Sequence, residues 1–265
     1  MKIWLKILGW ISFIALVIFL MFKVKDAQLE TIIDAPEITI SVKGENAFLT
    51  KDELIERLDR KGLIYYRQKY KELKPLEIER FINTMNEVKN SKVYTNIGTS
   101  WKIEIELRKP IARVINKYGE NYYIDEEGGK MPLSNLHTAH VLIVTGEIKD
   151  RLDNEKLDDI INNDSLKSIR KLDDIYFISN YVCKDQLFHS LIGQIHRLPN
   201  GDFVLIPKIG GQKIVFGSAY TQIEVEEKFK KLKVFYKEAI PYEGWNKYDE
   251  FILKYANQIV CKKKS

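Results

Sequence analysis

The sequence predicts an α+β protein with one N-terminal transmembrane helix, a small mixed module, and a C-terminal, mainly antiparallel β domain with flanking helices. Three patterns carry this prediction: an apolar run near the N-terminus, two amphipathic helices followed by an alternating strand, and many short strands and turns after residue 110. The 265 residues are 45% hydrophobic and 30% charged, which is ordinary for a globular protein. The net charge of +5 is spread along the chain, so no nucleic-acid-binding stripe is indicated.

The first pattern is the apolar run of residues 7–22, interrupted only by the small Gly9 and Ser12. With residues 3–5 it reaches roughly 20 residues, enough to cross a hydrocarbon layer of about 30 Å as a helix. We therefore predict a two-residue tail, residues 1–2, and a membrane helix over residues 3–22. A cleaved signal peptide is the alternative, but the run is long for one and no A-x-A-like site follows it.

The orientation of this helix is not given by charge, because Lys2 and Lys6 precede the run and Lys23 and Lys25 follow it. We place the N-terminus in the cytoplasm because a tail of two residues has no room for a function of its own. The bulk of the chain is then expected on the extracytoplasmic side of the cell (inner) membrane.

A linker, residues 23–36, leads to a first module predicted over residues 37–110. The module opens with a strand, residues 38–42. Thr50 then marks a helix start, because its side chain and that of Glu53 can each accept a hydrogen bond from the other's main-chain N–H.

Pro75 opens a second helix, since proline is tolerated in the first helical turn. Its apolar side chains recur at helical spacing through Val88, and a strand is expected at residues 93–97. From Trp101 to Arg108 apolar and charged residues alternate, which is typical of a half-buried strand. The order strand, helix, helix, strand, strand predicts helices on one face of a small sheet.

The C-terminal domain, residues 111–265, has shorter elements and more turns. Residues 187–198 fit either a helix or a strand, and Pro199 to Asp202 have the composition of a hairpin turn. Pro241 is expected to end the last helix. The remaining expectations are helices at residues 152–162 and 224–237, and strands at residues 111–115, 122–124, 141–144, 176–182, 203–206 and 213–216.

The final stretch, residues 247–260, alternates aromatic or aliphatic residues with polar ones and predicts one closing strand. A strand at the end of a chain often lies at a sheet edge. Such an edge is either protected by charge or used to bind a partner strand.

Chemical motifs are missing from the sequence: it has no P-loop, no G-x-S-x-G, no H-E-x-x-H and no C-x-x-C. His137 with His140, and His189 with His196, could each share a helix face, but nothing completes a metal site. We therefore predict no catalytic residue, no metal and no cofactor. Cys183 and Cys261 define no disulfide framework.

Five segments are similar to one known family. They are residues 38–54 with T-K-D-E-L, residues 101–114 with a basic-Pro-x-Ala step, residues 122–129 with an Asp–Gly turn, the hairpin FVLIPKIGGQKIVFG at residues 203–217, and the Asp-then-Tyr end at residues 248–260. In this combination and order the chain resembles the bacterial cell-division protein family FtsQ, called DivIB in Gram-positive bacteria. Residues 64–74 look like an insertion relative to that family, and the cytoplasmic tail is minimal.

The resemblance implies that residues 37–110 form a POTRA module, which contacts other division proteins, and that the chain is not an enzyme. It implies a divisome scaffold at the division septum that links early and late division proteins during septum formation. The C-terminal domain would bind FtsB/FtsL-type coiled-coil proteins by adding a partner strand to the last strand. The expected partner-binding residues are Tyr248, Phe251, Ile252, Leu253, Lys254, Tyr255, Ala256 and Asn257.

Two other interpretations remain open at this point. One is another POTRA-bearing envelope protein with a role in assembly or secretion, although the region after Pro110 is short and too helical for a membrane barrel. The other is a membrane-tethered hydrolase whose catalytic groups meet only in the folded chain.

Overall fold

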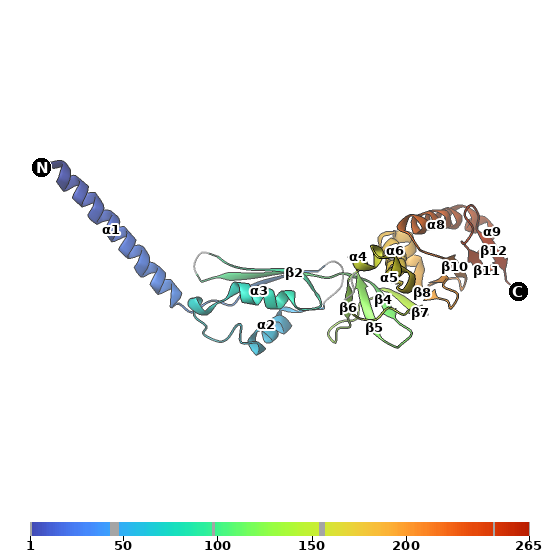
Figure 1. The fold of residues 1–265 in the computed structure, drawn as a ribbon, viewed down its shortest axis with the longest axis horizontal. Helices are drawn as coiled ribbons and strands as arrows, with labels where there is room; N and C mark the ends of the chain where they lie inside the picture. The colour runs from blue at the N-terminus through green and yellow to red at the C-terminus, as the bar shows by residue number, and fades with distance from the viewer. Residues whose placement is uncertain (1, 43–47, 97–98, 154–156, 246, 265) are drawn as a thin grey trace. The chain divides into compact units, whose positions relative to one another are not determined.

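The computed structural model describes residues 2–42, 48–96, 99–153, 157–245 and 247–264. It is an α+β protein with an N-terminal apolar helix and a large mixed sheet (Figure 1). The chain divides into two compact units at the step from Leu107 to Arg108. This step lies within three residues of the predicted domain boundary.

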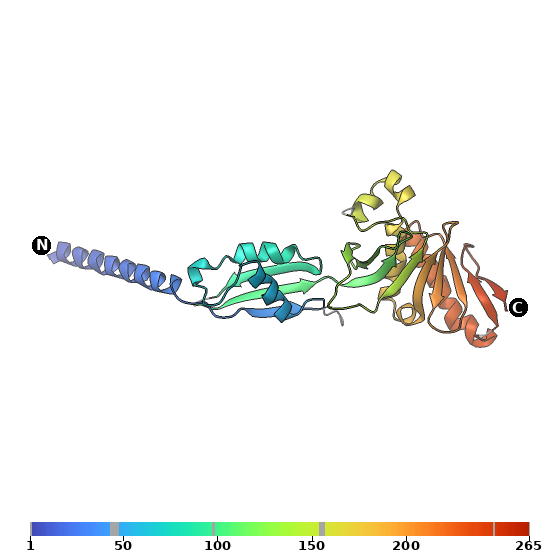
Figure 2. The same cartoon turned by 90° about the horizontal axis from the view of Figure 1, so that it is seen from below.

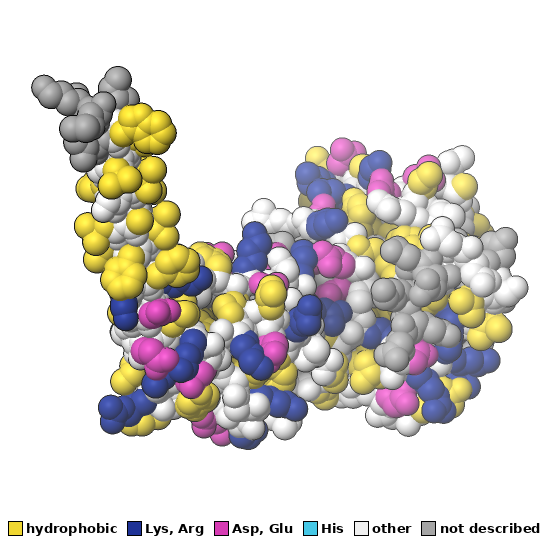
Figure 3. Space-filling view, turned by 60° about the vertical axis from the view of Figure 1, so that its left-hand side comes forward, with side chains coloured by type: hydrophobic (Ala, Val, Ile, Leu, Met, Phe, Trp, Pro, Cys, Tyr) yellow, Lys and Arg dark blue, Asp and Glu magenta, His cyan; other side chains and the backbone are white. Residues whose placement is uncertain are grey.

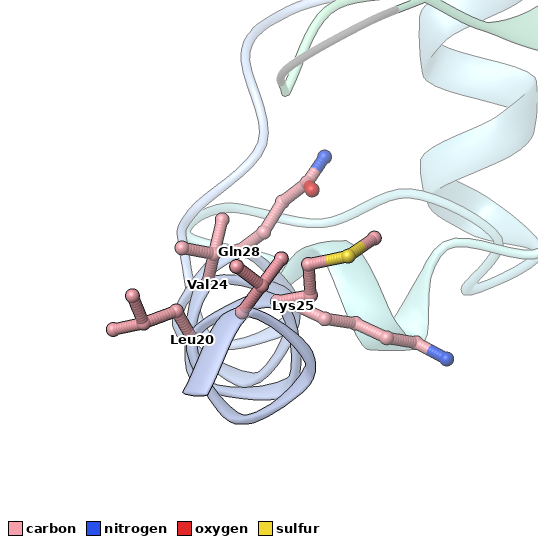
Figure 4. A pocket seen from close by; sticks show the side chains of 6 residues that line it. Leu20, Val24, Lys25 and Gln28 are labelled. Carbon is pink, nitrogen blue, oxygen red and sulfur yellow. The ribbon is translucent and has the colours of Figure 1, made fainter. Parts of the chain in front are cut away.

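The N-terminal helix α1, Lys2–Leu29, is long and apolar enough over Ile7–Leu29 to cross a membrane. Its described apolar side chains between Ile7 and Phe22 are exposed, and charged side chains are seen where the helix meets the rest of the unit (Figure 3). An open hollow of about 400 Å³ runs along α1 and is lined by α1 residues alone, among them Leu20, Val24 and Lys25 (Figure 4). The helix itself extends beyond the predicted membrane segment of residues 3–22 and continues into the predicted linker as far as Leu29.

The rest of the first unit contains two helices and a three-stranded sheet in the order β1-β3-β2. Strand β1 runs parallel to β3, and β2 runs antiparallel to it. The predicted order of strands and helices is confirmed, while the POTRA assignment remains a prediction. The elements are β1 (Glu37–Ser41), α2 (Lys51–Arg60), the 3₁₀ turn η1 (Tyr70–Glu72), α3 (Pro75–Asn83), β2 (Val88–Thr95) and β3 (Trp101–Leu107).

Local sequence signals explain where these elements begin. The Thr50 hydroxyl accepts a hydrogen bond from Glu53 N (3.2 Å), as expected of an N-cap. The reciprocal half of the capping box is replaced, because the Glu53 carboxylate pairs with Arg57 at 2.7 Å. Pro75 is the first residue of α3, as predicted. Val88 begins β2 instead of closing a helix face, which corrects one expectation.

The second unit contains a nine-stranded sheet with the order β12-β11-β10-β9-β8-β7-β4-β5-β6. Among the described strands, three neighbouring pairs are parallel, β4–β7, β7–β8 and β10–β11, and the other five are antiparallel, so the sheet is mixed with antiparallel pairs in the majority. The strands are β4 (Pro110–Ile115), β5 (Asn121–Asp125), β6 (Lys130–Pro132), β7 (Leu142–Gly146), β8 (Ile192–Arg197), β9 (Phe203–Pro207), β10 (Lys213–Gly217), β11 (Tyr248–Ile252) and β12 (Val260–Lys263).

Helices accompany this sheet, with α6 packing on β4, β7 and α8 (Figures 1 and 2). The core is aromatic: the rings of Tyr181 and Phe229 stack at 4.5 Å, and Phe188 and Phe216 close around Phe229. The helical elements are α4 (Leu157–Ile161), α5 (Asp164–Ile169), α6 (Leu172–Lys184), α7 (Gln186–Leu191), α8 (Gln222–Val234), the π-helical turn η2 (Phe235–Ala239) and α9 (Ile240–Glu243).

Several sequence expectations for this unit need correction. Residues 176–182 belong to helix α6, where Ile175, Ile178 and Val182 are buried at helical spacing. Of the predicted helix at residues 152–162, Leu157–Ile161 is helical as α4, residues 152–153 are not helical, and residues 154–156 lie outside the described residues. The chain stays helical past Pro241, which sits in the first turn of α9 where its missing N–H costs little.

Residues 187–198, which fit either a helix or a strand in the sequence, form a helix followed by a strand. The segment forms helix α7 up to Leu191 and strand β8 from Ile192. The hairpin of β9 and β10, predicted from the FVLIPKIGGQKIVFG motif, is confirmed with Ile214 opposite Leu205.

Candidate functional site

The C-terminal end of the chain forms a hairpin and not the single strand predicted for residues 247–260. Strand β11 pairs in parallel with β10, placing Phe251 beside Ile214. Its other side pairs with β12 in antiparallel register, with Phe251 opposite Cys261. Strand β11 therefore has no free edge, and the edge expected there is moved to β12.

Burial explains why β11 is an interior strand. Phe251 is 1% exposed, and its ring packs edge-on against Phe235 at 4.9 Å and Tyr248 at 6.1 Å. Leu253 is fully buried, and its N–H donates to the carbonyl of Val215 in β10 (2.9 Å). These two residues belong to the core of the unit.

After Leu253 the chain leaves the sheet because a lysine on α8 holds its carbonyl groups. Lys231 Nζ donates to the carbonyl oxygens of Leu253 (3.3 Å), Tyr255 (2.5 Å) and Ala256 (3.3 Å). Partial burial lowers the pKa of Lys231, and the nearby positive charge of Lys228 adds to this effect. The segment of residues 253–259, here called the connecting loop, is thus fixed to α8 before β12 begins.

Strand β12 is the last strand of the sheet, and no further strand lies beyond it in the described residues. Lys264 N donates to a carbonyl just before β11 (3.1 Å). Because main-chain groups alternate in direction along an antiparallel strand, Lys262 and Val260 also face β11. The N–H and C=O groups of Cys261 and Lys263 therefore point to the open side.

The side chains of this edge are mixed in character. Val260 is 38% exposed, while Cys261 packs partly against the core. Burial raises the pKa of the Cys261 thiol, and the negative charge of Glu243 adds to the effect. Lys262 lies 3.7 Å from Glu250, and Lys263 is exposed. The edge thus combines a small apolar surface with positive charge.

The eight predicted partner-binding residues are not brought together on one edge. Tyr248 and Ile252 are half-buried in β11, and the Tyr248 hydroxyl donates to Glu243 (3.0 Å). Phe251 and Leu253 are core residues. The other four lie exposed in the connecting loop, namely Lys254, which pairs with Asp202, and Tyr255, Ala256 and Asn257.

Sequence reasoning missed β12 and Lys231. The first could have been found, because Val260 and Cys261 precede a lysine run that is typical of a protected edge strand. The role of Lys231 could not be predicted from the sequence, because Lys231 is one of several lysines on α8 and the carbonyl groups that it binds lie more than 20 positions away.

Two carboxylates, Asp173 and Asp174, are buried at the start of α6. Burial raises the pKa of Asp174 to about 7, and the negative charge of Asp173 adds to this, while Lys171 opposes it from 3.4 Å. No group of three or more His, Cys, Asp or Glu side chains suited to a metal occurs in the described part of the chain. Cys183 and Cys261 are free thiols.

The architecture defines a class of protein: a chain with one apolar N-terminal helix, a three-stranded module and a mixed sheet that ends in an open edge. Residues 109–262 match the model of the family described as FtsQ/DivIB, C-terminal related. The chain belongs to this family. No similar protein was found among the curated proteins.

The matched segment spans the second unit almost from end to end, including β11 and most of β12. The match indicates a role in cell division, in a family whose members are non-catalytic division scaffolds. The apolar helix α1 is consistent with membrane anchoring.

Proposed function

We propose that this protein is a non-enzymatic scaffold of the divisome that captures an FtsB/FtsL-type partner by adding a strand of that partner to β12. The observation that carries the proposal is the open outer side of β12, at the end of a nine-stranded sheet in an FtsQ/DivIB-related domain. Capture would link early and late division proteins at the septum. The POTRA module would provide further contacts with the division machinery.

The mechanism is main-chain pairing, with side chains that set the register. Cys261 and Lys263 offer the N–H and C=O groups, and each bond contributes about 0.5–1.5 kcal/mol net. The positive charge of Lys262 and Lys263 favours acidic side chains in the partner strand. Tyr255 and Val260, both exposed, are the nearest apolar surfaces for anchoring side chains.

The family match also favours this function over the two alternatives, an envelope assembly or secretion protein and a membrane-tethered hydrolase. In this proposal the bulk of the chain lies on the extracytoplasmic side and α1 holds it in the cytoplasmic membrane.

The sharpest test is a proline in β12. Cys261→Pro removes an N–H that points to the open edge and leaves the bonds between β11 and β12 in place. We expect capture of the FtsB/FtsL-type partner in a pull-down to fall at least about tenfold, since a lost bond and the proline ring act together.

The matched control is Cys261→Ala, which keeps the N–H and should capture the partner normally. Circular dichroism of both variants shows whether the sheet is retained. Normal capture by a folded Cys261→Pro variant would refute pairing at this edge. A deletion from residue 248 onward is unsuitable, because it removes the buried Phe251 and Leu253.

A further inference from the structure

A second surface lies in the first unit, in the segment between α2 and η1. Two neighbouring side chains there, Tyr66 and Arg67, are both exposed, and Tyr66 has 91% of its surface accessible. The preceding Tyr65 is held in place, because its hydroxyl donates to Glu72 at 2.8 Å. A tyrosine ring this exposed is accessible to a partner, with an apolar body and a polar hydroxyl.

This segment is fixed to the chain immediately after α1. Ile33 N donates to Gln68 O (3.0 Å), and Tyr70 N donates to Thr31 O (2.9 Å). Glu30 adds ion pairs to Lys69 (2.7 Å) and Lys71 (2.5 Å). Gln68 is itself buried, with 2% exposure. The exposed pair therefore directly precedes a segment that is hydrogen-bonded to the residues just after α1.

Helix geometry places this junction at the membrane surface. The apolar run ends at Phe22, and the seven residues from there to Leu29 span about 10 Å along the helix. The headgroup layer on each side of the hydrocarbon is about 5–8 Å thick. Tyr66 lies two residues before Gln68, and those residues can reach back roughly 7 Å toward the headgroups.

Exposed positive side chains lie on the same part of the molecule, alongside the acidic Asp26 and Glu30. Lys23 and Lys25 follow the apolar run directly, and Figure 4 shows the Lys25 side chain extending away from α1. Among the described residues, no carboxylate lies within ion-pair distance of Lys23, Lys25 or Arg67. Arg67 also has a φ of +59°, which is uncommon for a residue other than glycine and places local strain at this position.

We propose that Tyr66 and Arg67 form a membrane-surface contact that docks on anionic phospholipid headgroups of the bilayer crossed by α1. The tyrosine ring suits the boundary between headgroups and hydrocarbon. The arginine guanidinium binds phosphate in a bidentate manner. Lys23 and Lys25 add attraction to the same leaflet. This contact would set how the first module stands on the membrane, independently of strand capture at β12.

The test uses the full chain with ¹³C-labelled tyrosine rings in lipid nanodiscs that contain a trace of gadolinium-chelating lipid. One set of nanodiscs is phosphatidylcholine alone, and the other is phosphatidylcholine mixed with phosphatidylglycerol. The Tyr66 signal is assigned by its loss in Tyr66→Phe. We expect strong paramagnetic broadening of Tyr66 that increases in the anionic nanodiscs.

Two controls make the result specific. Tyr242, 90% exposed in the second unit, matches the exposure of Tyr66 and should broaden less. Arg67→Asn removes the charge at a backbone conformation that asparagine tolerates, so the fold is kept. It should reduce the docked population in anionic nanodiscs about fivefold. Broadening of Tyr66 equal to that of Tyr242, or equal in the two lipid mixtures, would overturn the proposal.

Discussion

At the scale of single residues, Asp174 is a carboxyl group whose pKa departs far from its ordinary value. It lies in the first turn of α6 with 2% exposure, beside Asp173 and 3.4 Å from Lys171. Burial raises its pKa to about 7, with Asp173 adding to the shift. The folded protein therefore binds a proton that the unfolded chain, with a carboxyl pKa of about 3.9, has already released.

This shift makes stability depend on pH in a defined direction. Between about pH 4 and pH 7 the folded state binds more protons at Asp174, so the free energy of unfolding falls as the pH rises, by at most about 1.4 kcal/mol per unit. We expect a higher melting temperature at pH 5 than at pH 8, measured by thermal unfolding in detergent. Asp174→Asn should flatten this difference, whereas Asp249→Asn in β11 should retain it. An unchanged profile in Asp174→Asn would contradict the assignment.

At the scale of elements, the connecting loop between β11 and β12 determines where the free edge lies. Its path is set by Lys231 on α8, which binds three of its carbonyl groups. The loop buries little apolar surface beyond Leu253, and residues 254–258 are exposed. Its order therefore depends on a few polar contacts, which is typical of segments that open locally.

Replacement of Lys231 should loosen β12 without unfolding the unit. In Lys231→Met we expect amide hydrogen exchange in β12 to accelerate about tenfold, because roughly 1.4 kcal/mol of local hydrogen bonding is lost. Lys230→Met changes an exposed neighbour on the same helix and should leave exchange at the wild-type rate. Equal exchange rates in the two variants would show that Lys231 does not position the edge.

At the scale of the whole molecule, the chain combines a long exposed apolar helix with two units that each have their own sheet. The described side chains of α1 between Ile7 and Phe22 are all exposed, which is unfavourable in water. A lipid environment removes that cost, which is consistent with membrane anchoring by α1.

Charges placed in the middle of α1 test whether this helix anchors the protein in the membrane. We combine Ile14→Lys and Val17→Lys in one variant, and each lysine should cost about 3 kcal/mol of insertion free energy. We expect this variant to be released from membranes by alkaline carbonate, whereas Ile14→Leu with Val17→Ile remains in the pellet. Retention of the lysine variant would mean that another part of the chain anchors it.

Features that depend on neighbouring residues could be predicted from the sequence. The apolar run of α1, the N-cap at Thr50, the start of α3 at Pro75 and the β9–β10 hairpin all follow from local spacing or turn chemistry. Alternation in β3 was visible because one face of that strand is buried throughout. The family was also recognisable from the sequence, since its motifs occur in order along the chain.

The position of the free edge depends on contacts between residues that lie far apart in the sequence. The period-two pattern continues past Leu253, but the Lys231 contacts turn the chain there and return it as β12. Residues 176–182 were likewise misjudged, because a short apolar run fits a strand or a buried helix equally well until its neighbours are known. Pairing partners and distant lysines lie far away in the sequence, and local periodicity contains no information about them.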